Sequence, residues 1–202
     1  MKTPRPQSVQ HPSRESADRA TDGELVDTLV SREQITQRLA QLSDELTAHY
    51  QAAEVTLLVV LTGALVFVAD LIRRLELPLR IAVAQVSSYP GRSTRSQGPT
   101  VTLPGPADLT GRRVLVADDI LDSGATLAAI RQRIDKADPA EVRTCVLLRK
   151  RRADGPPLVQ ADHVGFDIPD VFVVGYGLDH NNLYRNLPDI HALRLGEGEE
   201  MP

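Results

Sequence analysis

The chain has 202 residues, of which 42% are hydrophobic and 25% are charged, a balance typical of one globular domain with a buried core. Its formal net charge of −4 argues against a nucleic-acid-binding surface, and no apolar stretch is long enough to cross a membrane. The single cysteine, Cys145, excludes a disulfide framework within the chain and favours a reducing compartment, here the cytoplasm.

The amino-terminal residues 1–23 are polar, contain proline and mixed charges, and lack an apolar signal core. This composition is typical of a disordered tail, so we expect one folded domain over residues 24–202. Its first element is expected near Leu25, where the short apolar run "LVDTLV" favours a strand.

Alternating helices and strands are predicted after this run. Ser31 and Gln34 have the spacing of a capping box, and apolar residues recur at helical spacing behind them. The predicted elements are a helix over 32–50, a strand over 55–61, a helix over 64–75, strands over 79–86 and 113–118, a helix over 125–136 and a strand over 142–148. The strand over 142–148 contains Cys145 in the apolar run "TCVLL", which indicates a buried, inert thiol rather than a reactive one. The alternation predicts right-handed βαβ units and therefore an α/β fold, with a central parallel sheet flanked by helices.

Two segments interrupt the alternation. Residues 87–100, "SSYPGRSTRSQGPT", are compatible with a solvated surface loop or with a mobile lid over an active site. Residues 156–195 lack a clear helix and contain short β-like pieces. We expect this stretch, called the hood below, to form a small appended subdomain.

The segment "DDILDSGAT", residues 118–126, combines features of an anion site with a cluster of acids. It is predicted to follow a strand and to start a helix, where unpaired backbone N–H groups and the helix dipole favour a phosphate. Gly124 permits close approach of the backbone, and Ser123 and Thr126 add hydroxyl donors. Helix capping by Asp122 or Ser123 would account for one residue, but not for the adjacent acids Asp118 and Asp119.

A phosphorylated sugar reconciles the two features. Carboxylates accept hydrogen bonds from the vicinal hydroxyls of ribose, and a pyrophosphate further along would bring Mg²⁺, beside which acids are favourable. Acids near the ribose C1 would also stabilise positive charge that develops there. We therefore expect the phosphate on the backbone of residues 122–126, and Asp118 and Asp119 facing the sugar.

The sequence "VLVADDILDSGATL" resembles the phosphoribosyl-pyrophosphate motif of the type I phosphoribosyltransferases, in which two acids follow an apolar strand and precede D-[ST]-G-x-T. The stretch "VGFDIPDVFVVGYGLDHNNLYRNLP" is similar to the hood of hypoxanthine-guanine phosphoribosyltransferases. Residues around "LVVLTGALVFVADLIRRL" are similar to their first core strand, pyrophosphate loop and helix. The resemblance spans residues 25–195 and implies transfer of phosphoribose from phosphoribosyl pyrophosphate to a 6-oxopurine, with Mg²⁺, in a homodimer or homotetramer.

The resemblance also implies roles for single residues in substrate binding. Asp118 and Asp119 would hold the ribose hydroxyls, directly or through Mg²⁺-bound water, and Asp122 would be catalytic, assisting proton transfer at the purine N7. Residues 122–126, namely Asp122, Ser123, Gly124, Ala125 and Thr126, would bind the 5′-phosphate. Pyrophosphate and the rest of that substrate would be contacted by Thr62, Gly63, Ser88, Tyr89 and Arg185.

Four further residues are implied to bind the purine. Lys150 would donate to its 6-oxo group, Phe172 would stack on it, and Val173 would use its backbone against the pyrimidine edge. Asp179 would contact the 2-amino group or the metal ion. From the residues alone, Lys150 is also compatible with a solvated basic edge, Phe172 with a core position, and Asp179 with a surface ion pair to Arg185.

Three positions depart from the family pattern. The pyrophosphate loop L-K-G-G is here Leu61-Thr62-Gly63-Ala64, and Val171 stands where a lysine is frequent. The family has a cis peptide bond before the loop's second residue, so the Leu61–Thr62 bond is expected to be cis, and Ala64 would be strained if its φ were positive. Alternative functions are a pyrimidine-linked member of the superfamily, whether enzyme or RNA-binding regulator, and a non-catalytic nucleotide sensor.

Overall fold

The computed structural model describes residues 23–87, 100–105 and 108–195. Residues 1–22 of the predicted tail, most of the expected lid, Ser88 and Tyr89 lie outside these residues. Gly23, the last residue of the predicted tail, is the first residue of a strand. In the described part of the chain, no helix combines the length and hydropathy required to cross a membrane.

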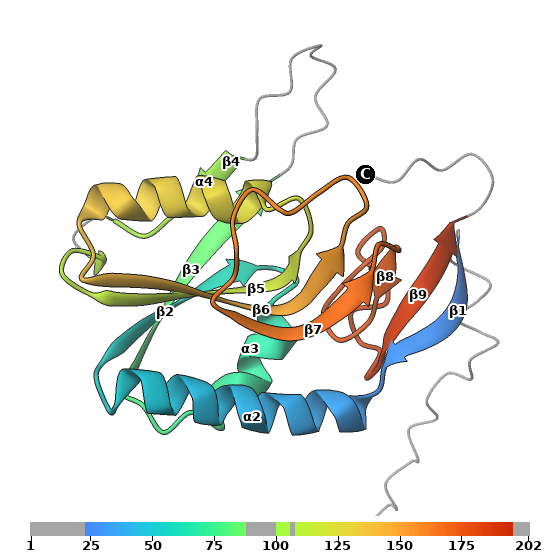
Figure 1. Ribbon diagram of the computed structural model, residues 1–202, viewed down its shortest axis with the longest axis horizontal. Helices are drawn as coiled ribbons and strands as arrows, with labels where there is room; N and C mark the ends of the chain where they lie inside the picture. The colour runs from blue at the N-terminus through green and yellow to red at the C-terminus, as the bar shows by residue number, and fades with distance from the viewer. Residues whose placement is uncertain (1–22, 88–99, 106–107, 196–202) are drawn as a thin grey trace, which may run out of the picture.

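A six-stranded sheet forms the centre of the molecule (Figure 1). Its order is β4-β3-β2-β5-β6-β7, in which every neighbouring pair is parallel except β3 with β4. The strands are β2 (Val55–Leu61), β3 (Leu79–Ser87), β4 (Thr100–Thr102), β5 (Arg113–Leu121), β6 (Glu141–Arg151) and β7 (His163–Pro169). The central strands β2 and β5 are apolar on both faces because helices cover both sides of the sheet.

Helices α2 (Arg32–Tyr50) and α3 (Leu65–Ile72) lie on one face of the sheet, and α4 (Ala125–Ile134) lies on the other (Figure 1). A short 3₁₀ helix, η2 (Asp135–Ala137), follows α4. The capping box is confirmed, since Gln34 N donates to Ser31 Oγ at 3.3 Å and Ser31 N donates to Gln34 Oε1 at 2.8 Å. Two apolar cores result, one on each face.

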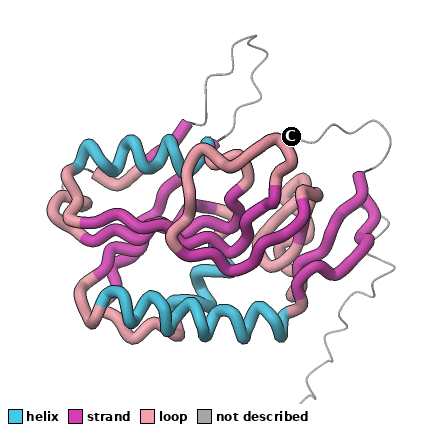
Figure 2. The backbone as a smooth tube through the Cα atoms, viewed as in Figure 1, coloured by secondary structure: helices cyan, strands magenta, loops and turns pink. Residues whose placement is uncertain are grey.

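A second, three-stranded antiparallel sheet has the order β1-β9-β8 and stands apart from the central sheet (Figure 2). Its strands are β1 (Gly23–Val30), β8 (Val173–Val174) and β9 (Ile190–Leu195). The structure divides the chain differently from the predicted hood, because the first strand joins this small sheet while β7 joins the central one. The small sheet is thus built from both ends of the described chain.

The predicted α/β fold is confirmed, and the predicted strand ends are too early in two places. The strand expected over 113–118 continues to Leu121, and the strand expected over 142–148 continues to Arg151. The strands continue past the expected ends because their backbones stay paired, Ile120 with Leu148 and Leu121 with Arg149. The acids of β5 and the lysine of β6 therefore lie on neighbouring strands at the carboxyl edge of the sheet.

Candidate active site

Two adjacent acids lie in the carboxyl-terminal half of β5. Asp118 is 4% exposed, and its Oδ1 accepts a hydrogen bond from Asp119 N at 3.0 Å. Asp119 Oδ1 accepts one from Ile120 N, also at 3.0 Å. Burial, and then the neighbouring Asp119 charge, raise the pKa of Asp118 well above its usual range, and burial also raises the pKa of Asp119. The pair therefore favours a cation, which would let both carboxyls ionise.

The loop after β2 presses against this acid pair. The Leu61–Thr62 peptide bond is cis, as the resemblance implied. A Cβ atom added to Gly63 would lie 1.7 Å from Asp119 Oδ2, so only glycine fits there. Ala64 has φ −70° and ψ −3° and is fully buried, so the replacement of a glycine by alanine at this position causes no backbone strain.

The turn between β5 and α4 has the geometry of an anion-binding loop. Gly124 has φ +80°, which glycine adopts at no steric cost, and α4 begins at the next residue. Ser123 Oγ accepts a hydrogen bond from Ala125 N at 3.3 Å, and the carbonyl of Ser123 accepts one from Leu158 N at 2.9 Å. The turn is therefore braced from behind by residues 157–159 while its N–H groups begin a helix.

Asp122 follows β5 and pairs with two cations from the end of β6. Lys150 Nζ lies 3.0 Å from Asp122 Oδ2, and Arg152 Nη1 binds Asp122 Oδ1. Burial alone would raise the pKa of Asp122, but the hydrogen bonds from Lys150 and Arg152 outweigh it and lower the pKa below its usual value. The Lys150 side chain is only 10% exposed, which excludes the solvated basic edge.

The edge of the small sheet stands beside these groups. Lys150 Nζ lies 3.7 Å from Asp170 Oδ1, two residues before Phe172, whose ring meets His180 edge-on at 5.4 Å. The carbonyl of Phe172 accepts a hydrogen bond from Leu193 N at 2.9 Å. Since bonded and non-bonded pairs alternate in an antiparallel ladder, the backbone N–H and C=O of Val173 point away from β9, toward the open edge.

Arg185 forms an ion pair and a hydrogen bond within the hood. Its Nη2 lies 2.7 Å from Asp179 Oδ1, and its Nη1 donates to the carbonyl of Gly177 at 2.7 Å. Asp179 Oδ2 accepts a further hydrogen bond from Asn182 N at 2.9 Å. Arg185 and Asp179 are thus a partly buried, oriented pair rather than a solvated one, and the positive charge of Arg185 favours the ionised form of Asp119.

The residues present fit a divalent cation that also binds substrate oxygens. In the described part of the chain, no three His, Cys, Asp or Glu side chains converge on a metal position, so Asp118, Asp119 and Asp179 do not form a closed protein cage. Mg²⁺ usually binds one or two carboxylates together with phosphate oxygens and water. Asp118, which is buried, and Asp119, which is partly exposed, both have raised pKa values and supply that partial set.

Sequence reasoning missed two parts of this arrangement. The motif does not mark Arg152 as part of the site. Arg152 lies two residues beyond Lys150, however, and an extended backbone places side chains at that spacing on the same side. The bracing of the turn at 122–126 by Leu158 carries no local sequence signal, because it depends on a loop that returns to Ser123 from a distance of 35 residues along the chain.

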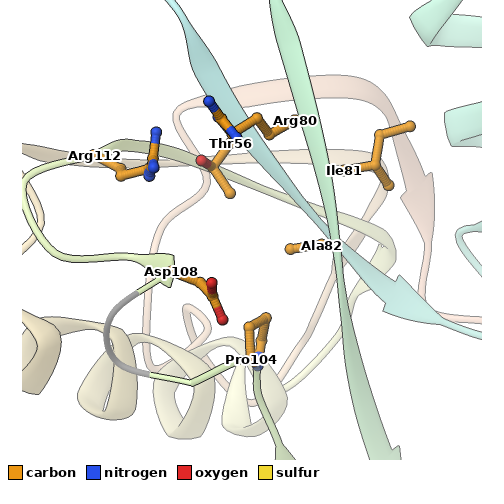
Figure 3. Close-up of a pocket in the computed structure, with 7 residues that line it drawn as sticks. All are labelled: Thr56, Arg80, Ile81, Ala82, Pro104, Asp108 and Arg112. Atoms are coloured by element: carbon orange, nitrogen blue, oxygen red, sulfur yellow. The ribbon is translucent and has the colours of Figure 1, made fainter.

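A separate cavity of about 490 Å³ lies at the opposite end of the strands (Figure 3). Thr56, Arg80 and Arg112 line it near the first residues of β2, β3 and β5, together with Asp108 and Pro104. The two arginines share Glu54, which accepts from Arg80 Nε at 2.8 Å and from Arg112 Nη1 at 2.7 Å. None of the predicted site residues lines this cavity.

Comparison with known proteins agrees with this geometry. Residues 26–181 match the model of the phosphoribosyl transferase domain family. The chain is 41% identical to the hypoxanthine-guanine phosphoribosyltransferase of Mycobacterium avium, over 85% of this chain and 87% of that one, and 40% identical to that of Bacillus subtilis, over 82% and 92%.

Solved structures agree as well. A crystal structure of hypoxanthine-guanine phosphoribosyltransferase from Bacillus anthracis superimposes with a TM-score of 0.75 at 34% identity, covering 84% of this chain and 99% of that one. A mutant hypoxanthine phosphoribosyltransferase from Trypanosoma cruzi, solved as a ternary substrates complex, gives 0.76 at 33% identity, covering 84% and 96%. The chain therefore belongs to the type I phosphoribosyltransferase family, in the group of the hypoxanthine-guanine phosphoribosyltransferases.

Proposed function

We propose that this protein acts in purine salvage and transfers the 5-phosphoribosyl group of phosphoribosyl pyrophosphate to hypoxanthine or guanine, forming IMP or GMP and pyrophosphate. One observation carries the proposal: the acid pair of β5, the anion-binding turn at 122–126 and Lys150 meet at the carboxyl ends of neighbouring parallel strands. In open α/β sheets, ligands bind at this edge.

Phosphoribosyl pyrophosphate would span the edge of the sheet. Its 5′-phosphate would bind the N–H groups of the turn at 122–126, where Gly124 opens the backbone. Asp118 and Asp119 would accept hydrogen bonds from the ribose hydroxyls. Pyrophosphate would lie against the backbone of Thr62 and Gly63, with Arg185 on its other side and Ser88 and Tyr89 as further predicted contacts.

Asp118 and Asp119 would hold Mg²⁺ together with substrate oxygens, and the bound ion would neutralise charge on the leaving pyrophosphate. Asp179 is a further candidate contact, for the cation or for the 2-amino group of guanine. The raised pKa values of the acid pair support this assignment, because an adjacent cation offsets the cost of ionising two neighbouring acids.

The purine would enter between Lys150 and the edge of the small sheet. A lysine ammonium carries three donors and no acceptor, so it suits a 6-oxo group and leaves a 6-amino group unpaired. Phe172 would stack on the ring. The backbone N–H and C=O of Val173, which point away from β9, would meet the pyrimidine edge of the base.

In the reaction, a purine ring nitrogen would form a bond to the ribose C1 while the bond from C1 to the pyrophosphate oxygen breaks. The leaving oxygen keeps the electron pair, and Asp122 would accept the N7 proton of the base, whose N–H electrons remain in the ring. Positive charge at C1 would be stabilised by the acids nearby. Asp122 must be ionised for this step, which its lowered pKa favours.

We further propose that the protein forms a homodimer through the face of α3 and β3. Leu65 is 54% exposed there, and Ile81 and Val83 on β3 are 58% and 42% exposed. Burial of these side chains by a second copy would remove apolar surface from water. Light scattering should give twice the monomer mass for the unmodified protein and a lower mass for Ile81→Lys.

The direct test of the reaction is product analysis with the purified full-length chain, Mg²⁺ and phosphoribosyl pyrophosphate. Hypoxanthine and guanine should each give their nucleotide and pyrophosphate in equal amounts. Uracil and orotate serve as comparison bases, since a pyrimidine-linked enzyme would use one of them. Tight binding of phosphoribosyl pyrophosphate without any product from these bases would instead indicate a sensor.

A further inference from the structure

Two cationic side chains from the carboxyl end of β6 contact the carboxylate of Asp122. Lys150 and Arg152 are two residues apart where β6 ends, so both project toward Asp122. Each takes a different oxygen: Lys150 Nζ lies 3.0 Å from Oδ2, and Arg152 Nη1 binds Oδ1.

Under the proposed function, Lys150 would have two hydrogen-bond partners, Asp122 and the 6-oxo group of the base. Its ammonium pairs with Asp122 in this structure, and the base would require it to turn its donors to the 6-oxo group. Asp122 would then lose part of its charge compensation at the moment when it must accept a proton. A half-exposed carboxylate without a cation returns toward its ordinary affinity for protons.

Arg152 faces no such conflict, because it is anchored on its far side. Its Nε donates to Asp154 Oδ1 at 2.8 Å, and its Nη2 binds Asp154 Oδ2. The planar guanidinium is thus fixed by one carboxylate while its remaining edge meets Asp122. With a side chain 24% exposed, it is partly shielded from solvent.

We propose that Arg152 is a positioning residue that keeps Asp122 ionised and oriented toward the base while Lys150 turns to the 6-oxo group. This inference rests on the proposed function and adds a residue to it. Arg152 would touch neither substrate and would act only through Asp122.

The charged groups around Asp122 agree with this role. Lys150 and Arg152 face it from the end of β6, and Asp170 and Asp154 lie behind these two cations rather than against Asp122 itself. Burial would raise the pKa of Asp122, but the two cations lower it. Removal of Arg152 should therefore raise that pKa, so the share of ionised Asp122 should fall most at acid pH.

The test uses the full-length protein carrying Arg152→Ala, Arg152→Lys or the control Arg151→Ala. Arg151 suits the control because its side chain is 74% exposed and faces Asp167, at 3.6 Å, instead of Asp122. The first measurement is the carbon-13 NMR titration of the Asp122 carboxyl, whose signal is identified by its loss in Asp122→Asn. The second is the pH profile of kcat/KM for hypoxanthine.

Arg152→Ala should move the titration midpoint of Asp122 to higher pH, and Arg151→Ala should leave it in place. Loss of kcat/KM in Arg152→Ala should grow as the pH falls toward the titration midpoint of Asp122 and should stay under about threefold near pH 8, where Asp122 is ionised in every variant. Arg152→Lys, which keeps the cation, should recover most of the activity lost at acid pH. A merely structural role would lower activity equally at all pH values.

An Asp122 midpoint that does not move in Arg152→Ala overturns the inference, whether or not the protein is active. A pH-independent loss of kcat/KM overturns it as well, because the residue would then act on the fold and not on Asp122. If the unmodified protein forms no nucleotide, the proposed function fails and the role of Arg152 in that reaction fails with it. The titration still tells the two failures apart.

Discussion

Gly63→Ala tests whether the pyrophosphate loop must lie against the acid pair. The added Cβ would stand 1.7 Å from Asp119 Oδ2 and 2.5 Å from its Cγ, whereas real Cβ contacts essentially never fall under 3.0 Å. The loop or the carboxyl group must therefore move by more than 1 Å. A misplacement of about 1 Å can cost on the order of 10²-fold in rate, so we expect kcat/KM to fall about 10²-fold.

The matched control is Gly105→Ala, whose Cβ would meet Asp108 Oδ2 at an ordinary 3.4 Å. Overpacking typically costs about 1–3 kcal/mol of folding free energy, and the loop can shift without disrupting a core. The melting temperature of Gly63→Ala should therefore drop by only a few degrees. Steady-state kinetics and thermal melting of both variants decide the question. Activity of Gly63→Ala within about threefold of the control would refute the claim that close packing on Asp119 is needed.

Three further outcomes follow from the site and the core. Asp122→Asn should lower kcat roughly 10²-fold, the lower range for a general acid–base group, with little change in melting; unchanged kcat would remove Asp122 from the mechanism. Asp118→Asn should abolish transfer and yet stabilise the fold in the absence of Mg²⁺. The pKa of Asp118 is raised in the folded state, so its contribution to stability is present at acid pH and is lost as pH rises, and the gain in melting temperature should be larger at pH 8 than at pH 5. A gain that is equal at both pH values would show that the charge is not responsible. Burial raises the pKa of the Cys145 thiol to about 12, so a thiol reagent should label the native protein at pH 8 only as fast as it unfolds, and rapid labelling would contradict the buried, inert assignment.

Most of the fold was predictable because its signals are local. The capping box at Ser31 and Gln34 follows from spacing, and the apolar strand that leads to Asp118 follows from composition. The structure confirms both. The composition of the small sheet was not predictable, because β1 pairs with β9 across more than 160 residues and neither strand carries a signal for its partner. The same holds for the bracing of the turn at 122–126 by Leu158.

The site was predictable to the extent that it lies within continuous motifs. The proximity of Asp122 and Lys150 follows from the extra pairing of β5 with β6, which continues beyond the apolar residues that mark a strand in the sequence. Ala64 would be strained only with a positive φ, and it is not strained because it caps α3 with a negative φ. Side-chain exposure, which decides between a solvated and a functional Lys150, cannot be read from a motif.

The central claim is that Lys150 selects a 6-oxopurine, and the ratio of kcat/KM for hypoxanthine over adenine tests it most directly. A buried donor left unpaired by the wrong base can reject that base strongly, so adenine should be at least about 10²-fold worse, on the order of 3 kcal/mol. Lys150→Ala should weaken hypoxanthine far more than any residual adenine reaction and so reduce the ratio. A native preference for adenine, or a ratio that Lys150→Ala leaves intact, would contradict the account.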